Sequence, residues 1–125
     1  MKFPYNRDNT PPAPFFTVSV CHPTQLEAVV EVLAKIDTAA DVTGIPETLV
    51  ERLRLEPAGE IVLTGFDRQK RSVKLYWVVI ALPLGRQGRL KAAAVSTDYI
   101  LLGRDVLNHL RLLLDGPALT FEILD

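Results

Sequence analysis

The sequence predicts an all-β domain that carries one or two short helices. Short runs rich in β-branched and aromatic residues recur along the chain, and turn signals built from glycine, proline and aspartate separate them. Helical spacing of apolar residues is confined to short stretches. With 125 residues, of which 48% are apolar and 23% charged, the chain has the size and composition of about one globular domain with its own core.

The N-terminal segment, residues 1–14, is expected to form a leader, and residues 15–125 are expected to form the domain. Four of the nine prolines fall in this leader, and polar residues separate Pro4 from Pro11, Pro12 and Pro14. Such a composition favours an extended, polyproline-like backbone. We therefore expect the leader to lie outside the core.

Two strands and a sharp loop are expected next. Phe15–Val20 combines aromatic with β-branched residues, as strands do. In Val29–Ile36 the apolar residues at alternate positions share one face, while Glu31 and Lys35 share the other. The small and polar residues of Asp37–Asp41 then predict a loop at the end of the second strand.

A short helix and a long hairpin are expected in the middle of the chain. Pro46–Arg54 begins with a proline and carries apolar residues at helical spacing. Glu60–Thr64 and Ser72–Leu82 are typical of strands, and the polar segment between them contains several basic residues. This pattern predicts a hairpin with a charged, exposed tip.

The C-terminal part is expected to return to short strands. A turn at Gly85–Gly88 precedes the predicted strands Ala92–Val95 and Tyr99–Leu102. Asp105 is expected to cap a short helix, because apolar residues follow it at helical spacing. The predicted strand Ala118–Leu124 closes the chain.

Composition excludes several classes of function. Fourteen basic and fifteen acidic residues give a net charge of -1, so no basic excess is available to bind nucleic acid. The apolar run Leu75–Leu84 is too short to span a membrane as a helix. The single cysteine, Cys21, cannot form an intrachain disulfide, which favours a cytoplasmic protein. Two histidines and one cysteine show no metal-ligand spacing, so we expect no metal site.

Two segments resemble those of the retroviral-type (retropepsin-like) aspartic proteases. Ile36–Asp41 is similar to the loop in which an apolar strand delivers Asp-Thr/Ser-Gly-Ala, and Ile100–Leu107 is similar to the family's apolar-apolar-Gly-Arg-Asp/Asn-apolar-Leu segment. The hairpin between them lies where the family has its flap. The resemblance extends over Phe15–Leu124, and it implies a retropepsin-like acid protease β-barrel with its active site at a homodimer interface.

The chemistry of such a site can be argued from the residues themselves. Hydrolysis by carboxyl groups requires one carboxylate to deprotonate a water and one carboxylic acid to polarise the peptide carbonyl. This chain contains one Asp-Thr and no Asp-Ser, so a two-fold homodimer would have to supply Asp37 from each subunit. The resemblance, together with this single loop, therefore predicts an aspartic endopeptidase that acts on a peptide or protein substrate without a cofactor.

The resemblance implies roles for the matching residues. Asp37 is the catalytic carboxylate, and the hydroxyl of Thr38 bonds across the dimer. Ala39 and Asp41 contact the substrate backbone, and Arg104 forms a structural ion pair with Asp41. Loop support is also implied for Ala39 and Ala40, substrate binding for Thr64, Gly65, Phe66 and Leu101, a flap for Thr64–Lys70, and a place in the dimer interface for Leu119–Leu124.

Three alternatives remain open. Ala39 stands where most of the family has glycine, and its Cβ adds bulk beside the substrate path, so the chain could be a catalytically impaired peptide-binding or scaffold dimer. A monomeric β domain that binds a partner protein would make Asp37 an ordinary turn residue. A hydrolase that uses Cys21 with His22 is a distant alternative, because neighbours on a strand point to opposite faces.

Overall fold

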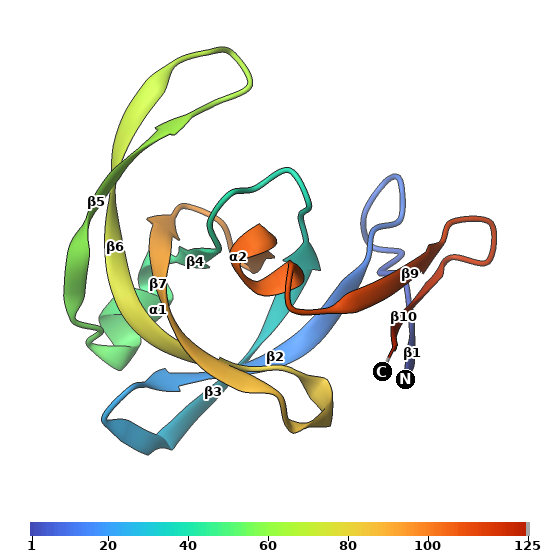
Figure 1. The fold of residues 1–125 in the computed structure, drawn as a ribbon, viewed down its shortest axis with the longest axis horizontal. Coiled ribbons are helices and arrows are strands. Elements are labelled where there is room, and N and C mark those ends of the chain that lie inside the picture. Colours follow the sequence, from blue (N-terminus) through green and yellow to red (C-terminus); the bar gives the residue numbers. More distant parts are fainter. Residues whose placement is uncertain (125) are drawn as a thin grey trace.

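The computed structural model describes residues 1–124, and over this range the chain is mostly β, as the sequence predicts (Figure 1). The elements are β1 (Lys2–Pro4), β2 (Phe15–His22), β3 (Gln25–Ile36), β4 (Gly44–Pro46), α1 (Glu47–Leu53), β5 (Pro57–Thr64), β6 (Lys70–Ala81), the 3-10 turn η1 (Pro83–Gly85), β7 (Gln87–Val95), β8 (Ile100–Leu102), α2 (Arg104–Leu107), β9 (Arg111–Asp115) and β10 (Thr120–Leu124). None of the helices in this range is both long and apolar enough to cross a bilayer.

The larger sheet closes on itself. Its strand order is β2-β3-β8-β4-β7-β6-β5, and β2 also pairs with β6, which joins the two sides of the sheet into a barrel (Figure 1). β3 and β8 run parallel, with Ile36 opposite Leu102. This pairing brings the end of β3 beside the start of α2, although more than sixty residues separate them in the chain.

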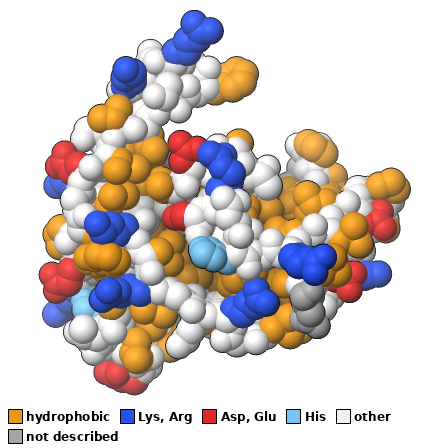
Figure 2. Space-filling view, in the orientation of Figure 1, with side chains coloured by type: hydrophobic (Ala, Val, Ile, Leu, Met, Phe, Trp, Pro, Cys, Tyr) orange, Lys and Arg blue, Asp and Glu red, His pale blue; other side chains and the backbone are white. Residues whose placement is uncertain are grey.

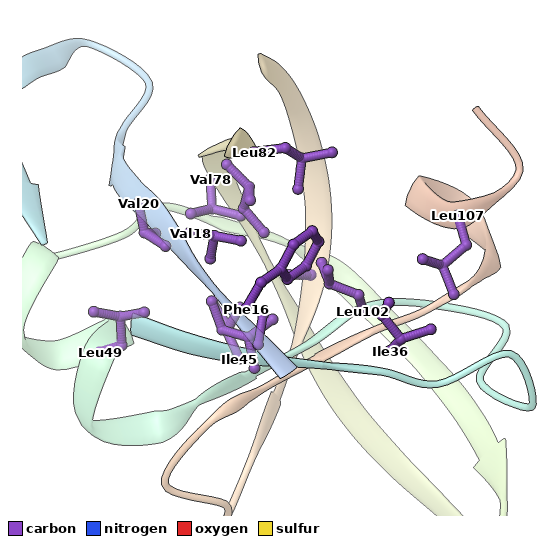
Figure 3. Close-up of a cluster of buried hydrophobic side chains, with 14 of the residues drawn as sticks. Phe16, Val18, Val20, Ile36, Ile45, Leu49, Val78, Leu82, Leu102 and Leu107 are labelled. Carbon is purple, nitrogen blue, oxygen red and sulfur yellow. The ribbon is translucent and has the colours of Figure 1, made fainter. Parts of the chain in front are cut away.

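The core fills the barrel and confirms the predicted inward face of β3. Ala34 and Ile36 are buried, and Val30 and Val32 are half-buried, whereas Glu31 is exposed. Figure 3 shows side chains from several strands and both helices converging in this core. They include Phe16, Val18, Val20, Ile36, Ile45, Leu49, Val78, Leu82, Leu102 and Leu107.

A second sheet corrects the expectation for the leader. β1 pairs with β10, and the Phe3 ring lies 5.1 Å from the Phe121 ring and 5.4 Å from the Phe16 ring. Ala13, at the other end of the leader, is also buried and bridges to Asn6. The expectation that the leader lies outside the core was wrong, because the half-buried rings of Phe3 and Tyr5 pack against the core and Ala13 is buried. The domain boundary at residue 14 stays a prediction.

The cap of α2 also differs from the prediction. Gly103, with an extended backbone, is the N-cap, and Asp105 lies inside the first turn. The carboxylate of Asp105 is instead directed toward Thr43 on another segment. Oδ1 of Asp105 also accepts the N–H of Val106 at 3.0 Å, so the side chain serves both the first turn of α2 and a tertiary contact that the local sequence pattern does not reveal.

Candidate active site

Asp37 stands where β3 leaves the barrel and turns. Its backbone N–H donates to the carbonyl of Leu102 at 3.0 Å, which ties the residue to β8. Its Oδ1 accepts a hydrogen bond from the backbone N–H of Ala39 at 3.1 Å, and its carbonyl accepts one from Ala40 at 3.2 Å. These bonds form a tight turn that leaves the Asp37 carboxyl half-exposed and in a defined orientation.

Arg104 holds the loop from the side of α2. Its Nη1 donates to the carbonyl of Thr38 at 2.9 Å, and its Nη2 forms an ion pair with Oδ1 of Asp41. Its backbone N–H donates to the carbonyl of Ala40 at 2.9 Å. Because the ion pair is partly exposed, it adds little to stability, and its main effect is to fix the shape of the loop.

A buried polar cluster, Thr43 with Asp105, supports the same loop and was missed by sequence reasoning. Thr43 is fully buried; its hydroxyl donates to Oδ1 of Asp105 at 2.7 Å and its backbone N–H donates to Oδ2 at 3.0 Å. The hydroxyl also accepts the N–H of Gly103 at 3.1 Å. A threonine between Val42 and Gly44 gives only a weak indication of such a cluster, because its partner Asp105 lies 62 residues away in the sequence.

Gly103 is required by close packing rather than by its backbone conformation. A Cβ at this position would lie 2.7 Å from the backbone carbon of Val42 and 3.0 Å from the carbonyl oxygen of Ala40. Both neighbours are backbone atoms of the loop that carries Asp37. The Gly-Arg-Asp segment therefore packs directly against this loop.

Ala39 fits the loop without backbone strain. Among the described residues, positive φ angles at positions other than glycine occur at Arg54, Arg68, Leu84 and Leu119, and Ala39 is not one of them. Its side chain is exposed. The local backbone therefore does not demand the glycine that the resemblance leads one to expect here.

A cleft of about 1090 Å³ lies between this loop and the β5–β6 hairpin. Figure 2 shows it as the hollow between the projecting hairpin and the body of the molecule. Five of the predicted site residues line it, namely Asp37, Thr64, Gly65, Phe66 and Leu101. The other four predicted contact and support residues, Thr38, Ala39, Ala40 and Asp41, lie in the loop and are not part of its lining.

Several further lining residues were not identified from the sequence. They belong to α1, to the strands of the hairpin and to the end of β7, and include Glu47, Val50, Glu51, Leu63, Arg71, Val73, Tyr76, Val95 and Ser96. The apolar stripe of the helix was predicted from its spacing, but the spacing does not reveal that Val50 borders a cleft while Leu49 enters the core.

The tip of the hairpin is exposed and charged, as predicted. The N–H of Gly65 donates to the carbonyl of Gln69 at 2.9 Å, and Oδ1 of Asp67 accepts the N–H of Gln69 at 3.1 Å. Phe66 is fully exposed to solvent at this turn, and Arg68 is also exposed. The tip is therefore an ordered turn that presents an aromatic ring and basic side chains.

Cys21 and His22 lie outside this cleft. Burial raises the pKa of the Cys21 thiol, and the charge of Glu27 raises that pKa further, which disfavours a nucleophilic thiolate. Nδ1 of His22 accepts the N–H of Thr24 at 3.0 Å. Nothing in this arrangement supports a hydrolase that uses Cys21.

Comparison with known proteins identifies the fold. The sequence matches no protein-family model and no curated protein. The structure is similar to the EIAV protease solved with an inhibitor, with a TM-score of 0.64 and 18% identity over 86% of this chain and 93% of that one. It is similar to a retropepsin-like aspartic protease from Rickettsia conorii, with a TM-score of 0.60 and 14% identity over 99% of this chain and 92% of that one. The protease of Simian Foamy Virus (mac) has a TM-score of 0.53 and 18% identity over 74% of this chain and 92% of that one. The predicted retropepsin-like fold is thereby confirmed.

Proposed function

On this retropepsin-like fold, we propose that two copies of the chain form an aspartic endopeptidase. The observation that carries the proposal is the position of Asp37, which borders the cleft beneath the hairpin at the start of a loop held by α2. The chain provides one such loop, so the second carboxyl group must come from a second copy.

The proposed chemistry needs two carboxyl groups that share one proton. Two carboxyls held close together cannot both ionise, so they titrate as a coupled pair. The ionised Asp37 removes a proton from a water, and the protonated Asp37 of the other copy donates a hydrogen bond to the scissile carbonyl. The water adds to that carbonyl without a covalent enzyme intermediate, and this chemistry requires no cofactor.

The cleft suits a substrate in extended conformation. A peptide lying between the hairpin and the Asp37 loop would pair with backbone groups on both sides, as an added strand does. The resemblance assigns Thr64, Gly65 and Phe66 to the flap that closes over this peptide. Leu101 lines the floor of the cleft near Asp37, where it would contact an apolar substrate side chain.

Three further assignments of the resemblance belong to this proposal. Ala39 and Asp41 would contact the substrate backbone, and the hydroxyl of Thr38 would bond to its counterpart in the second copy. Thr38 is exposed, so its hydroxyl is accessible to such a partner. We expect the enzyme to work on cytoplasmic peptides or proteins, and not on nucleic acid or at a membrane.

The proposal is tested by cleavage of a mixed peptide library from acid to neutral pH, with and without a statine-type inhibitor. We expect cleavage that is abolished by Asp37→Asn and by the inhibitor. Asp8→Asn, which changes an exposed carboxyl in the leader, is the matched control and should leave cleavage unchanged. Cleavage that survives Asp37→Asn would contradict the proposal, and a dimer without any cleavage would favour the scaffold alternative.

A further inference from the structure

We propose that a pocket between α2 and the end of the β6–β7 hairpin binds the free C-terminus of an extended peptide whose last side chain is apolar. The pocket has a volume of about 430 Å³, which is in the range of ligand-binding sites. It shares no lining residue with the cleft that contains Asp37. The inference is therefore independent of the proposed function.

Apolar side chains from three elements form the walls of this pocket. Ile80, in β6, and Leu82, just after it, are buried. Leu90 of β7, Val106 of α2 and Leu110 are half-buried. All five belong to the core or pack against it, so their positions are fixed by close packing. Burial of a polar group against such walls would be costly, so the part of a ligand that enters the pocket must be apolar.

The guanidinium of Arg86 lies at this pocket with most of its hydrogen-bond donors unused. Its Nη1 donates to the carbonyl of His109 at 3.1 Å, which links the hairpin to the segment after α2. A guanidinium has five N–H donors, and a carboxylate binds best to two of them at once. No acidic side chain in residues 1–124 forms an ion pair with Arg86. The bond to His109 therefore orients the guanidinium and leaves its other donors to a carboxylate of the ligand.

The other charged side chains of the lining are engaged elsewhere. Both carboxylate oxygens of Asp105 accept hydrogen bonds, from Thr43 and from the first turn of α2. The guanidinium of Arg89 lies 4.7 Å from the centre of the Trp77 ring, in a cation–π contact. Arg86 therefore carries the charge that the pocket offers to a ligand, and that charge selects an anion.

The strand β7 adds an open edge to the same pocket. The N–H of Ala93 donates to the carbonyl of Thr43 at 2.8 Å, on the side of β4. Successive residues of a strand direct their backbone groups to opposite sides, and the pairing of β7 with β6 has no bulge. The N–H and C=O groups of Arg89 and Lys91 therefore also point away from β6. Since β4 pairs with β7 only from Ala93 onward, no described strand covers them.

The apolar walls, the cation and the open edge fit one kind of ligand. A peptide added to β7 in the antiparallel direction has its C-terminal end beside the start of β7, where Arg86 lies. Its terminal carboxylate would bind the guanidinium, its backbone would pair with Arg89, and its last side chain would lie against Leu82. A neutral C-terminus would leave the guanidinium without an anion, and a charged last side chain would be buried without a partner.

Three matched peptides test this site. They are short, fluorescent and identical except at the end, which is leucine with a free carboxylate, leucine amide, or aspartate. Fluorescence anisotropy with the Asp37→Asn chain measures their binding without cleavage. We expect the leucine carboxylate to bind at least about tenfold more tightly than the other two. A statine-type inhibitor should not displace it, because the inhibitor is directed to the Asp37 cleft.

Substitutions at Arg86 test the source of this preference. In Arg86→Gln the leucine carboxylate and the leucine amide should bind alike, whereas Arg86→Lys, which keeps the charge, should retain part of the difference. Arg52→Gln, on the exposed surface of α1, is the matched control and should leave all three affinities unchanged. Circular dichroism verifies that each variant is folded.

Backbone pairing is tested at Arg89. Arg89→Pro removes an N–H that points to the open edge rather than to β6, so it should weaken binding of the leucine carboxylate beyond the effect of Arg89→Ala. Equal affinities of these two variants would contradict the added strand. The whole inference would be overturned by an absence of saturable binding up to about 1 mM peptide. Equal binding of carboxylate and amide to the Asp37→Asn chain, an Arg86→Gln variant that keeps the preference, or displacement by the inhibitor would overturn it as well.

Discussion

At position 39, the backbone conformation shows whether the loop tolerates alanine in place of the glycine of the family pattern. The φ of Ala39 is ordinary and its methyl group is exposed, so glycine would relieve no strain. We expect Ala39→Gly to lower the free energy of unfolding by about 0.5–1 kcal/mol, because glycine adds freedom to the unfolded chain. Urea unfolding measures this effect.

The same variant decides between enzyme and scaffold. If the native chain is a competent enzyme, Ala39→Gly should change kcat/KM for a cleaved peptide by less than about tenfold, or about 1.4 kcal/mol in the barrier. If the native chain is inert and Ala39→Gly is active, the methyl group of Ala39 blocks the site. That result would favour the catalytically impaired dimer over the enzyme.

Thr43 is a buried residue whose polar contacts contribute to stability. Thr43→Val keeps the shape but removes the hydroxyl that bonds Asp105 and accepts the N–H of Gly103. We expect a loss of about 2–3 kcal/mol in the free energy of unfolding, since a carboxylate and a buried N–H each lose a partner. Thr48→Val, on the exposed surface of α1, is the matched control, and its effect should stay within about 0.5 kcal/mol. Equal losses in the two variants would contradict this role.

At the scale of elements, the contact of α2 with the Asp37 loop depends on the absence of a side chain at Gly103. In Gly103→Ala the new Cβ would meet backbone atoms of the loop, which cannot move without displacing Asp37. We expect a loss of about 2 kcal/mol or more in stability and a loss of cleavage. In the control Gly88→Ala, in β7, the new Cβ would have no atom within 4 Å, so stability and cleavage should stay nearly unchanged. Normal cleavage by Gly103→Ala would show that the loop does not depend on this packing.

The N-terminal strand is expected to be part of the folded unit. Phe3→Ala removes a ring that packs against Phe121 and Phe16 from β1. Because Phe3 is half-buried, we expect a loss of about 2 kcal/mol in the free energy of unfolding, below the range for a fully buried ring. Arg7→Ala, in the exposed part of the leader, should change it by less than about 0.5 kcal/mol. An unchanged stability in Phe3→Ala would restore the view of the leader as a detached segment.

Local patterns account for the elements that sequence reasoning found. Alternation along Val29–Ile36 predicted both the strand and its buried face, and proline with helical spacing predicted α1 nearly to its ends. The patterns failed where the role of a residue depends on a partner that is distant in the sequence. Asp105 looks like a cap until Thr43 is known to lie beside it, and Phe3 looks like part of a polar leader until β10 is placed next to it.

At the scale of the whole molecule, the pairings that close the fold join segments far apart in the chain. The pairing of β2 with β6 closes the barrel, and the pairing of β1 with β10 joins the two ends of the chain. Periodicity within a strand carries no information on such partners. The Asp-Thr loop and the Gly-Arg-Asp segment were predictable as a pair only through resemblance, while the structure supplies the contacts of Arg104 that hold them together.

The central claim is that one active site uses Asp37 from two copies of the chain. The most direct measurement mixes native protein with Asp37→Asn at fixed total concentration, allows subunits to exchange, and records the rate of peptide cleavage. If both carboxyls are required, only native–native dimers are active, and an equal mixture should retain about a quarter of the native rate. A mixture with Asp8→Asn should retain the full rate. Retention of about half the native rate in the Asp37→Asn mixture would show that each chain acts alone, and would contradict the account.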